Sequence, residues 1–181
     1  MRILFGIIVI SVSLTWSLAS ADPGAEPGFT PFFNGKDLTG WRTKKDNVSL
    51  EGRVDAYNKR FFVENEELVI DPKVNGDVII ETIRPFSGDV IIRFEFKPAN
   101  GCNNDLFIRG VKFDLTAKNV PNMKHDVWNA FQIVVRNGQI EFSNNEELLK
   151  TVTAKPTATP LGIRAEQGGV RFRHFRYRDG K

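Results

Sequence analysis

Apolar and polar residues alternate along most of this 181-residue chain with a period close to two. This alternation is typical of half-buried β-strands, whose successive side chains point to opposite faces of a sheet. After residue 28, no stretch shows the 3.6-residue periodicity of an amphipathic helix. The pattern predicts strands at 60–63, 67–70, 78–83, 90–97, 105–109, 111–115, 129–136, 139–142, 148–152, 161–166 and 170–177.

Turn-forming residues separate these strands. Asn75-Gly76 precedes one strand, and Asn137-Gly138 lies between two apolar stretches. Because Asn and Gly both tolerate positive φ, the second dipeptide predicts a tight β-hairpin. Many short strands at even spacing, with Gly, Asn and Pro between them, are typical of a sandwich or barrel. We therefore predict an all-β fold, a two-sheet antiparallel β-sandwich of the jelly-roll type.

The last predicted strand contains one irregularity. Val170 and Phe172 share one face, whereas Phe175 and Tyr177 have the opposite parity. One extra residue between the two pairs would bring all four side chains to the core, as a β-bulge does. We therefore predict a bulge at His174 and the residue before it, and we interpret His174 as a bulge residue rather than a ligand.

The first 21 residues have the features of a secretory signal peptide: a basic start, an apolar stretch and a small-residue cleavage site ending at Ala21. The alternative is an uncleaved membrane anchor, but the apolar stretch is too short to span a bilayer with margin. We expect cleavage after Ala21, a flexible linker over 22–28 and a single domain over 29–181. The expected location is periplasmic or extracellular, in a bacterium.

Composition indicates that stability comes from packing. Cys102 is the only cysteine, so no intrachain disulfide can form, and fifteen phenylalanines supply a large aromatic core. The net charge of +3 is mild, but arginines gather near the C-terminus, at positions 164, 171, 173, 176 and 178. A solvated strand face is the simpler interpretation of these arginines, and an anion site is the alternative. Export argues against nucleic acid as a partner.

Parity also divides the side chains of the central strands into two sets. Ile92, Phe94 and Phe96 alternate with charged residues, and the strands at 105–109, 111–115 and 161–166 follow the same rule. If these strands are neighbours, their outward positions form one face of mixed charge: Arg93, Glu95, Asp105, Phe107, Arg109, Lys112, Asp114, Arg164 and Glu166. One interpretation is a solvated face of cross-strand ion pairs. The other is a concave sugar site in which Phe107 supports a pyranose ring and polar side chains bind hydroxyls.

Other kinds of chemistry are not indicated. His125 and His174 lack metal-ligand spacing, and Cys102 has no histidine nearby in the sequence. The sequence contains no nucleophile elbow, phosphate-binding loop or dinucleotide fingerprint. We therefore expect no cofactor. A divalent metal ion could act as an electrophile, but no ligand set for one is readable.

The string Phe29-Thr-Pro-Phe-Phe-Asn-Gly-Lys-Asp-Leu-Thr-Gly-Trp41 resembles the opening of the 3-keto-disaccharide hydrolase-like family. Its members are exported bacterial domains, 3-keto-glucoside lyases or hydratases, with a concanavalin A-like jelly-roll fold. Segments at 92–97, 100–110, 128–129, 160–164 and 170–175 are similar to further family motifs. The chain departs from the family pattern at Lys112, Asp114 and Arg164, where many members have Glu, Gln and Gln.

The resemblance implies cleavage of glycosides that are already oxidised to a ketone at C3. The ketone acidifies the C2 proton, so a base removes it, the C1 substituent leaves, and water then adds. On this basis Asp114 or Glu166 is the candidate base, and Arg109 or Arg164 is the candidate group that stabilises the enolate. The remaining substrate-binding candidates are Asn103, Asn104, Asp105, Phe107 and Lys112. The expected partner is a small saccharide or glycoside.

Two alternatives of the same fold stay open. One is a non-catalytic carbohydrate-binding module, favoured by the substitutions at Lys112, Asp114 and Arg164. Neighbouring arginines would also lower the pKa of Asp114 and weaken it as a base. The other is a structural or adhesive domain whose C-terminal arginines bind anionic glycans. Fold alone cannot choose among these functions.

Overall fold

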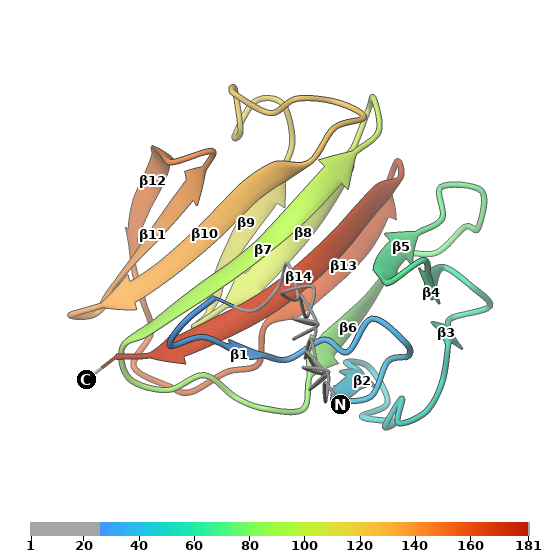
Figure 1. Ribbon diagram of the computed structural model, residues 1–181, viewed down its shortest axis with the longest axis horizontal. Coiled ribbons are helices and arrows are strands. Elements are labelled where there is room, and N and C mark those ends of the chain that lie inside the picture. The colour runs from blue at the N-terminus through green and yellow to red at the C-terminus, as the bar shows by residue number, and fades with distance from the viewer. Residues whose placement is uncertain (1–25, 181) are drawn as a thin grey trace, which may run out of the picture.

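The computed structural model describes residues 26–180, which form two antiparallel β-sheets packed face to face (Figure 1). The predicted signal peptide, and residues 22–25 of the predicted linker, lie outside the described residues. Residues 26–180 contain no α-helix, and the predicted jelly-roll β-sandwich is confirmed. In this part of the chain no helix long and apolar enough to cross a membrane is found.

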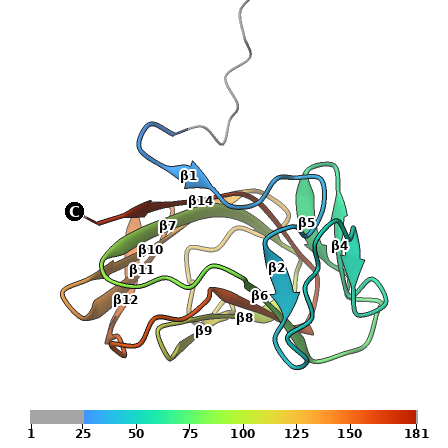
Figure 2. The same cartoon turned by 90° about the horizontal axis from the view of Figure 1, so that it is seen from below.

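The larger sheet has nine strands and the smaller has five. Eight strands of the larger sheet follow in the order β12 (Glu147–Thr153), β11 (Gln139–Asn144), β10 (Asn129–Arg136), β7 (Val90–Pro98), β14 (Val170–Asp179), β5 (Glu67–Ile70), β4 (Phe61–Glu64) and β3 (Asp55–Ala56), and β1 (Thr30–Pro31) also pairs with β14. The order in the smaller sheet is β2 (Trp41–Thr43), β6 (Val78–Thr82), β13 (Gly162–Gln167), β8 (Asn103–Ile108) and β9 (Val111–Leu115). Figure 2 shows β14, β7 and β10 in one layer and β6, β8 and β9 in the other.

Every strand predicted from the alternation is present, with its ends shifted by at most two residues. The Asn137-Gly138 hairpin is confirmed, because both residues have positive φ and the flanking Arg136 and Gln139 pair across β10 and β11. Three strands were not predicted: β1, β2 and β3. Each has only two or three residues, which is too short to establish an alternation.

The core between the sheets is built largely from phenylalanine. The ring of Phe94 lies 5.2 Å from that of Phe131 and 5.0 Å from that of Phe175, measured between centroids. Phe113 of the smaller sheet stacks on Phe142 of the larger sheet at 4.4 Å. Each buried side chain of this size stabilises the fold by about 1.5–3 kcal/mol. Aromatic packing therefore joins the two sheets without a disulfide.

The motif at residues 29–41 contains a turn at Asn34 and a buried side chain, Trp41. The side-chain oxygen of Asn34 accepts hydrogen bonds from the backbone N–H groups of Lys36 and Asp37, at 2.8 and 3.0 Å. Gly40 has a φ of 88°, which favours glycine. Trp41 follows and is fully buried, with its ring 5.7 Å from that of Phe175. The motif thus reverses the chain and fixes it to the core.

The predicted bulge in β14 is also confirmed. His174 has a φ of 56°, and the pairing of β14 with β7 changes register between Arg173 and Arg176. As a result Phe172 and Phe175 are both fully buried although their parity differs. The bulge leaves the arginines of β14 on the outer face of the larger sheet.

Candidate functional site

The residues predicted to share one polar face lie on two faces. Arg93 and Glu95 belong to β7 in the nine-stranded sheet, whereas Asp105, Asp114 and Glu166 belong to β8, β9 and β13 in the five-stranded sheet. The prediction of a single face is therefore wrong, because it required these strands to be neighbours. Within the strands the side-chain parity was correct, but the assignment of strands to sheets was not.

Arg109 lies on neither face. It occupies the turn between β8 and β9 with a φ of 51°, and it is only 6% exposed. Its guanidinium donates hydrogen bonds to the backbone carbonyls of Gly88 (3.1 Å), Lys155 (2.9 Å) and Pro156 (3.2 Å). The placement of Arg109 on the polar face is thus corrected: it ties two loops together, and its donors are used inside the fold.

The two predicted asparagines lie at the start of β8. Asn104 is fully buried, donates to the carbonyl of Gln167 at 3.1 Å and accepts from the N–H of Glu166 at 2.9 Å. Its amide therefore holds β8 against β13 and does not reach solvent. Asn103 is half-buried and pairs in register with Gln167.

Arg164 is the centre of a charge cluster on the outer face of the five-stranded sheet. Its guanidinium contacts Asp77 through two bonds of 2.6 and 2.5 Å, Asp105 at 2.7 Å and Glu166 at 2.9 Å. The hydrogen bonds to Asp77 and then to Asp105 raise the pKa of Arg164 well above its usual value. The cluster brings together most of the predicted site residues. Their charged groups form ion pairs with one another.

Asp105 and Asp114 form a second part of this cluster. They face each other in register across β8 and β9, and Lys112 contacts both, at 3.6 Å and 2.5 Å respectively. Asp105 is fully buried, and burial raises its pKa. The contact with Arg164 acts to lower this pKa, and the facing Asp114 acts to raise it further. The ammonium of Lys112 lowers the pKa of Asp114. One oxygen of Asp105, Oδ1, has no hydrogen-bond partner.

Phe107 lies next to this cluster on the same outer face. It is half-buried, pairs in register with Lys112 on one side and with Gly162 on the other, and has the Lys44 ammonium 5.9 Å from its ring centroid. Gly162 provides no side chain, so the Phe107 ring lies close to the backbone of β13.

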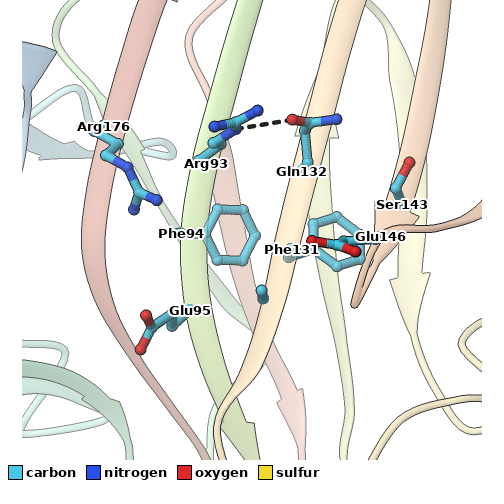
Figure 3. A pocket seen from close by; sticks show the side chains of 9 residues that line it. Arg93, Phe94, Glu95, Phe131, Gln132, Ser143, Glu146 and Arg176 are labelled. Carbon is cyan, nitrogen blue, oxygen red and sulfur yellow. Dashed lines mark hydrogen bonds between the residues drawn. The ribbon is translucent and has the colours of Figure 1, made fainter. Parts of the chain in front are cut away.

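A hollow of about 360 Å³ lies on the outer face of the nine-stranded sheet (Figure 3). Neighbouring strands contribute a row of register partners across its floor, Arg176, Arg93, Gln132 and Ser143. The adjacent row pairs Glu95 with Ala130. Polar side chains from four strands therefore converge on one depression.

Ala130, with its small side chain, lines the hollow. On one side Ala130 pairs with Glu95, and on the other its backbone exchanges hydrogen bonds with Asn145, at 2.8 and 2.9 Å. Asn145 and Glu146 form the two-residue turn between β11 and β12, with φ values of 48° and 70°. The turn brings Glu146 to the rim opposite Glu95, and the Ala130 methyl leaves the space between them open.

Electrostatics orient the polar groups of the hollow. Arg93 Nε donates to Gln132 Oε1 at 2.8 Å, as the dashed line in Figure 3 marks. Glu95 accepts from Arg173 Nε at 2.7 Å and lies 3.4 Å from His174 Nδ1. Burial acts to raise the pKa of Glu95, but Arg173 and His174 outweigh it and hold the pKa below its usual value. Glu95 is therefore an ionised, oriented carboxylate.

Sequence reasoning named Arg93 and Glu95 but missed Gln132, Ser143 and Glu146. The alternation at 129–136 already placed Ala130 and Gln132 outward. The pairing of β10 with β7, which brings these side chains next to Arg93 and Glu95, could not be predicted from any local pattern. Among the described residues, no group of three His, Cys, Asp or Glu side chains is placed to hold a metal ion.

The fold and the hollow define a jelly-roll domain with a polar depression on the outer face of one sheet. A family model described as "3-keto-alpha-glucoside-1,2-lyase-like domain" matches residues 28–123. The match covers more than half of the chain, and the chain therefore belongs to this family. This confirms the resemblance seen in residues 29–41 and the coarse expectation of a carbohydrate-active family. Glu95 lies inside the matched range, whereas Gln132, Ser143 and Glu146 follow it.

Solved structures agree on the fold. A Parabacteroides distasonis protein, described provisionally as a glycosyl hydrolase, is similar over 85% of this chain and 95% of its own, with 16% identity and a TM-score of 0.64. A carbohydrate-binding module from Bacillus subtilis covers 78% and 97%, with 12% identity and a TM-score of 0.55. A Bacillus licheniformis β-glucanase covers 84% and 97%, with 9% identity and a TM-score of 0.56. Comparison with curated proteins finds no match.

Proposed function

We propose that this domain binds 3-keto-glycosides in the hollow of the nine-stranded sheet and cleaves them by elimination and hydration. The observation that carries the proposal is the arrangement of Glu95 and Glu146 on opposite sides of Ala130, next to the Arg93–Gln132 pair. A pyranose seated over Ala130 would meet a carboxylate on each side and a cation at one end. Membership of the family supplies the class of reaction.

The reaction requires a base and a group that stabilises an enolate. The base takes the C2 proton, and the C2–H electron pair moves to form an enolate whose charge lies on the C3 oxygen. When the C3 carbonyl forms again, a C1–C2 double bond forms and the bond from C1 to the leaving oxygen breaks. The leaving oxygen takes the proton back from the base. Water then adds its hydroxyl to C1 and a proton to C2, which gives a 3-keto sugar and a free alcohol.

We assign the base to Glu146 and the enolate-stabilising role to Arg93. Glu95 is already held by Arg173 and His174, and its lowered pKa makes it a weak base, so it is suited to orienting sugar hydroxyls. Arg93 is held by Gln132 through Nε and contacts the carboxylate of Glu26 through Nη1, so its cationic head is oriented at one end of the hollow. A preorganised cation of this kind stabilises negative charge that develops on an oxygen.

The alternative location is the cluster on the five-stranded sheet, where Asp114 and Glu166 would be the base candidates. Asp105 is the carboxyl with the raised pKa there, but it lies beneath Arg164 and Lys112 and is fully buried. Asp114 is exposed enough to react, yet Lys112 lowers its pKa. The paired charges of this face favour a structural role.

Product release from a panel of 3-keto-disaccharides and their unoxidised parents, with and without divalent ions, tests the proposal. We expect the protein to cleave only the keto sugars. Loss of a general base lowers a rate by about 10²–10⁴-fold, so Glu146→Gln should reduce turnover by at least about 100-fold. The matched variants Asp114→Asn and Glu166→Gln should stay within about three-fold of the wild type. The opposite pattern would move the site to the five-stranded sheet.

A second candidate function is a non-catalytic carbohydrate-binding module. It is favoured by the ion pairs of the charged groups in the hollow, because Glu95 is held by Arg173 and Arg93 by Glu26, and groups held in this way can bind sugar hydroxyls without any proton transfer. In that case calorimetry would detect binding of a saccharide, Glu95→Gln would weaken it, and none of the panel would be cleaved.

A further inference from the structure

Arg93 and Arg176 lie side by side at one end of the hollow, on neighbouring strands (Figure 3). They are direct register partners across β7 and β14. Like charges in this position destabilise a sheet unless an anion lies between them. The anion here is Glu26, which contacts Arg93 with Oε1 and Arg176 with Oε2, the latter at 2.8 Å. One carboxylate thus bridges both guanidinium groups.

Glu26 lies outside the strands, unlike the acidic partners of Arg171 and Arg173. Arg171 pairs with Glu67 at 2.7 Å, and Arg173 pairs with Glu95 at 2.7 Å. Both of those carboxylates project from strands of the same sheet, β5 and β7. Glu26 instead precedes the first strand. Its carboxylate can therefore leave the arginines without any strand being moved.

A local turn places Glu26 on the sheet. Phe29 N–H donates to the carbonyl of Glu26 at 2.9 Å, with Pro27 and Gly28 between them and a Gly28 φ of 80°. Pro followed by a positive-φ Gly is the composition of a type II turn. The Phe29 ring then lies 4.8 Å from the guanidinium carbon of Arg93. The segment is thus held by its own turn and by an aromatic contact, independently of the carboxylate.

We propose that Arg93 and Arg176 form a carboxylate subsite of the hollow, that its ligand is a uronic-acid-containing saccharide, and that Glu26 occupies this subsite when no ligand is bound. Arg176 is oriented for the role because Nη1 donates to the carbonyl of His174 at 2.9 Å, which leaves Nε directed at the carboxylate. Arginine pairs recognise carboxylates through charge-assisted hydrogen bonds. A uronate whose ring lies over Ala130 would place its carboxylate where that of Glu26 now lies.

The exposure of the groups makes exchange feasible. The side chains of Glu26, Arg93 and Arg176 are 31%, 33% and 17% exposed. Ion pairs at such positions contribute little to stability, so a ligand carboxylate can replace one at small cost. Glu26 then acts as an internal competitor that weakens binding of acidic sugars and leaves neutral ones unaffected.

The test is calorimetric binding of methyl glucuronide, methyl glucoside and acetate to the whole protein and its variants. The wild type should prefer the glucuronide over the glucoside, and Glu26→Gln should increase affinity for the glucuronide about five-fold or more with no change for the glucoside. Arg176→Gln should remove the preference. Glu64→Gln, which removes an acidic partner of Arg171 at 3.2 Å, is the matched control and should change neither affinity.

Two results would overturn the inference: equal affinity of Glu26→Gln for the two sugars, or acetate binding as tightly as the glucuronide, which would indicate a plain anion contact. The inference rests on the proposed function in using the same hollow and the same Arg93, whereas Arg176 and Glu26 belong to the subsite alone. Cleavage of neutral 3-keto sugars without a uronide preference would reject the subsite and keep the proposed function. A uronide preference without cleavage would keep the subsite and reject the proposed function.

Discussion

Asp105 and Glu95 both occupy outward strand positions, but their pKa values are shifted in opposite directions. Burial acts to raise the pKa of both. At Asp105 burial is the largest cause and prevails over the lowering by Arg164, and the facing Asp114 adds to the rise. At Glu95 the contacts with Arg173 and His174 prevail and the pKa falls. Burial is thus the stronger influence at the fully buried Asp105, and ion pairing is the stronger influence at the partly exposed Glu95.

The raised pKa of Asp105 makes a prediction about stability and pH. An acid with a raised pKa is protonated in the folded state at pH values where the unfolded chain has already lost the proton. Its contribution is therefore fully present below the unfolded pKa of about 3.9 and is lost as the pH rises through the folded pKa. We expect the stability advantage of the wild type over Asp105→Asn to shrink as the pH rises from about 4.

Chemical denaturation at a series of pH values measures this slope. Asp77→Asn is the internal control, because Asp77 binds the same Arg164 and its pKa is lowered. Its contribution is lost as the pH falls, so the advantage of the wild type over Asp77→Asn should grow with pH. Slopes of the same sign for both variants would show that Arg164, and not burial, controls Asp105.

At the scale of elements, strand parity was predictable and strand pairing was not. Alternation is a local property of the backbone, so the sequence alone placed Phe94 inward and Glu95 outward. The β14 bulge was also readable, because Phe172 and Phe175 required one extra residue. The pairing of β7 with β10 and β14, rather than with β8, depends on contacts distant in sequence. The predicted polar face was therefore divided between the sheets.

The bulge itself can be tested at His174. Deleting this residue would turn Phe175 and the side chains after it to the opposite face, so we expect the variant not to fold. His174→Gly keeps the extra residue and suits its positive φ, so its free energy of unfolding should lie within about 1 kcal/mol of the wild-type value. Thermal unfolding followed by circular dichroism would distinguish the two. A folded deletion variant with wild-type stability would refute the role given to the bulge.

At the scale of the whole molecule, the two outer faces have different characters. On the five-stranded face, charges around Arg164 are paired with one another and cover Asp105. On the nine-stranded face, Ala130 leaves a hollow between Glu95 and Glu146. The fold class and the family were predictable because they depend on parity, turn residues and the opening motif. The hollow was not, because it depends on one small side chain meeting a turn from another hairpin.

Turnover of a 3-keto-disaccharide by Ala130→Leu is the decisive measurement for a site in the hollow. Ala130 is exposed, so the larger side chain should fill the hollow while stability stays within about 0.5 kcal/mol of the wild type. Ala158→Leu, at an exposed loop position away from the hollow, is the matched control. We predict that Ala130→Leu loses at least about 100-fold in turnover and that Ala158→Leu loses none. Wild-type turnover by a stable Ala130→Leu protein would contradict the assignment of the site to the nine-stranded sheet.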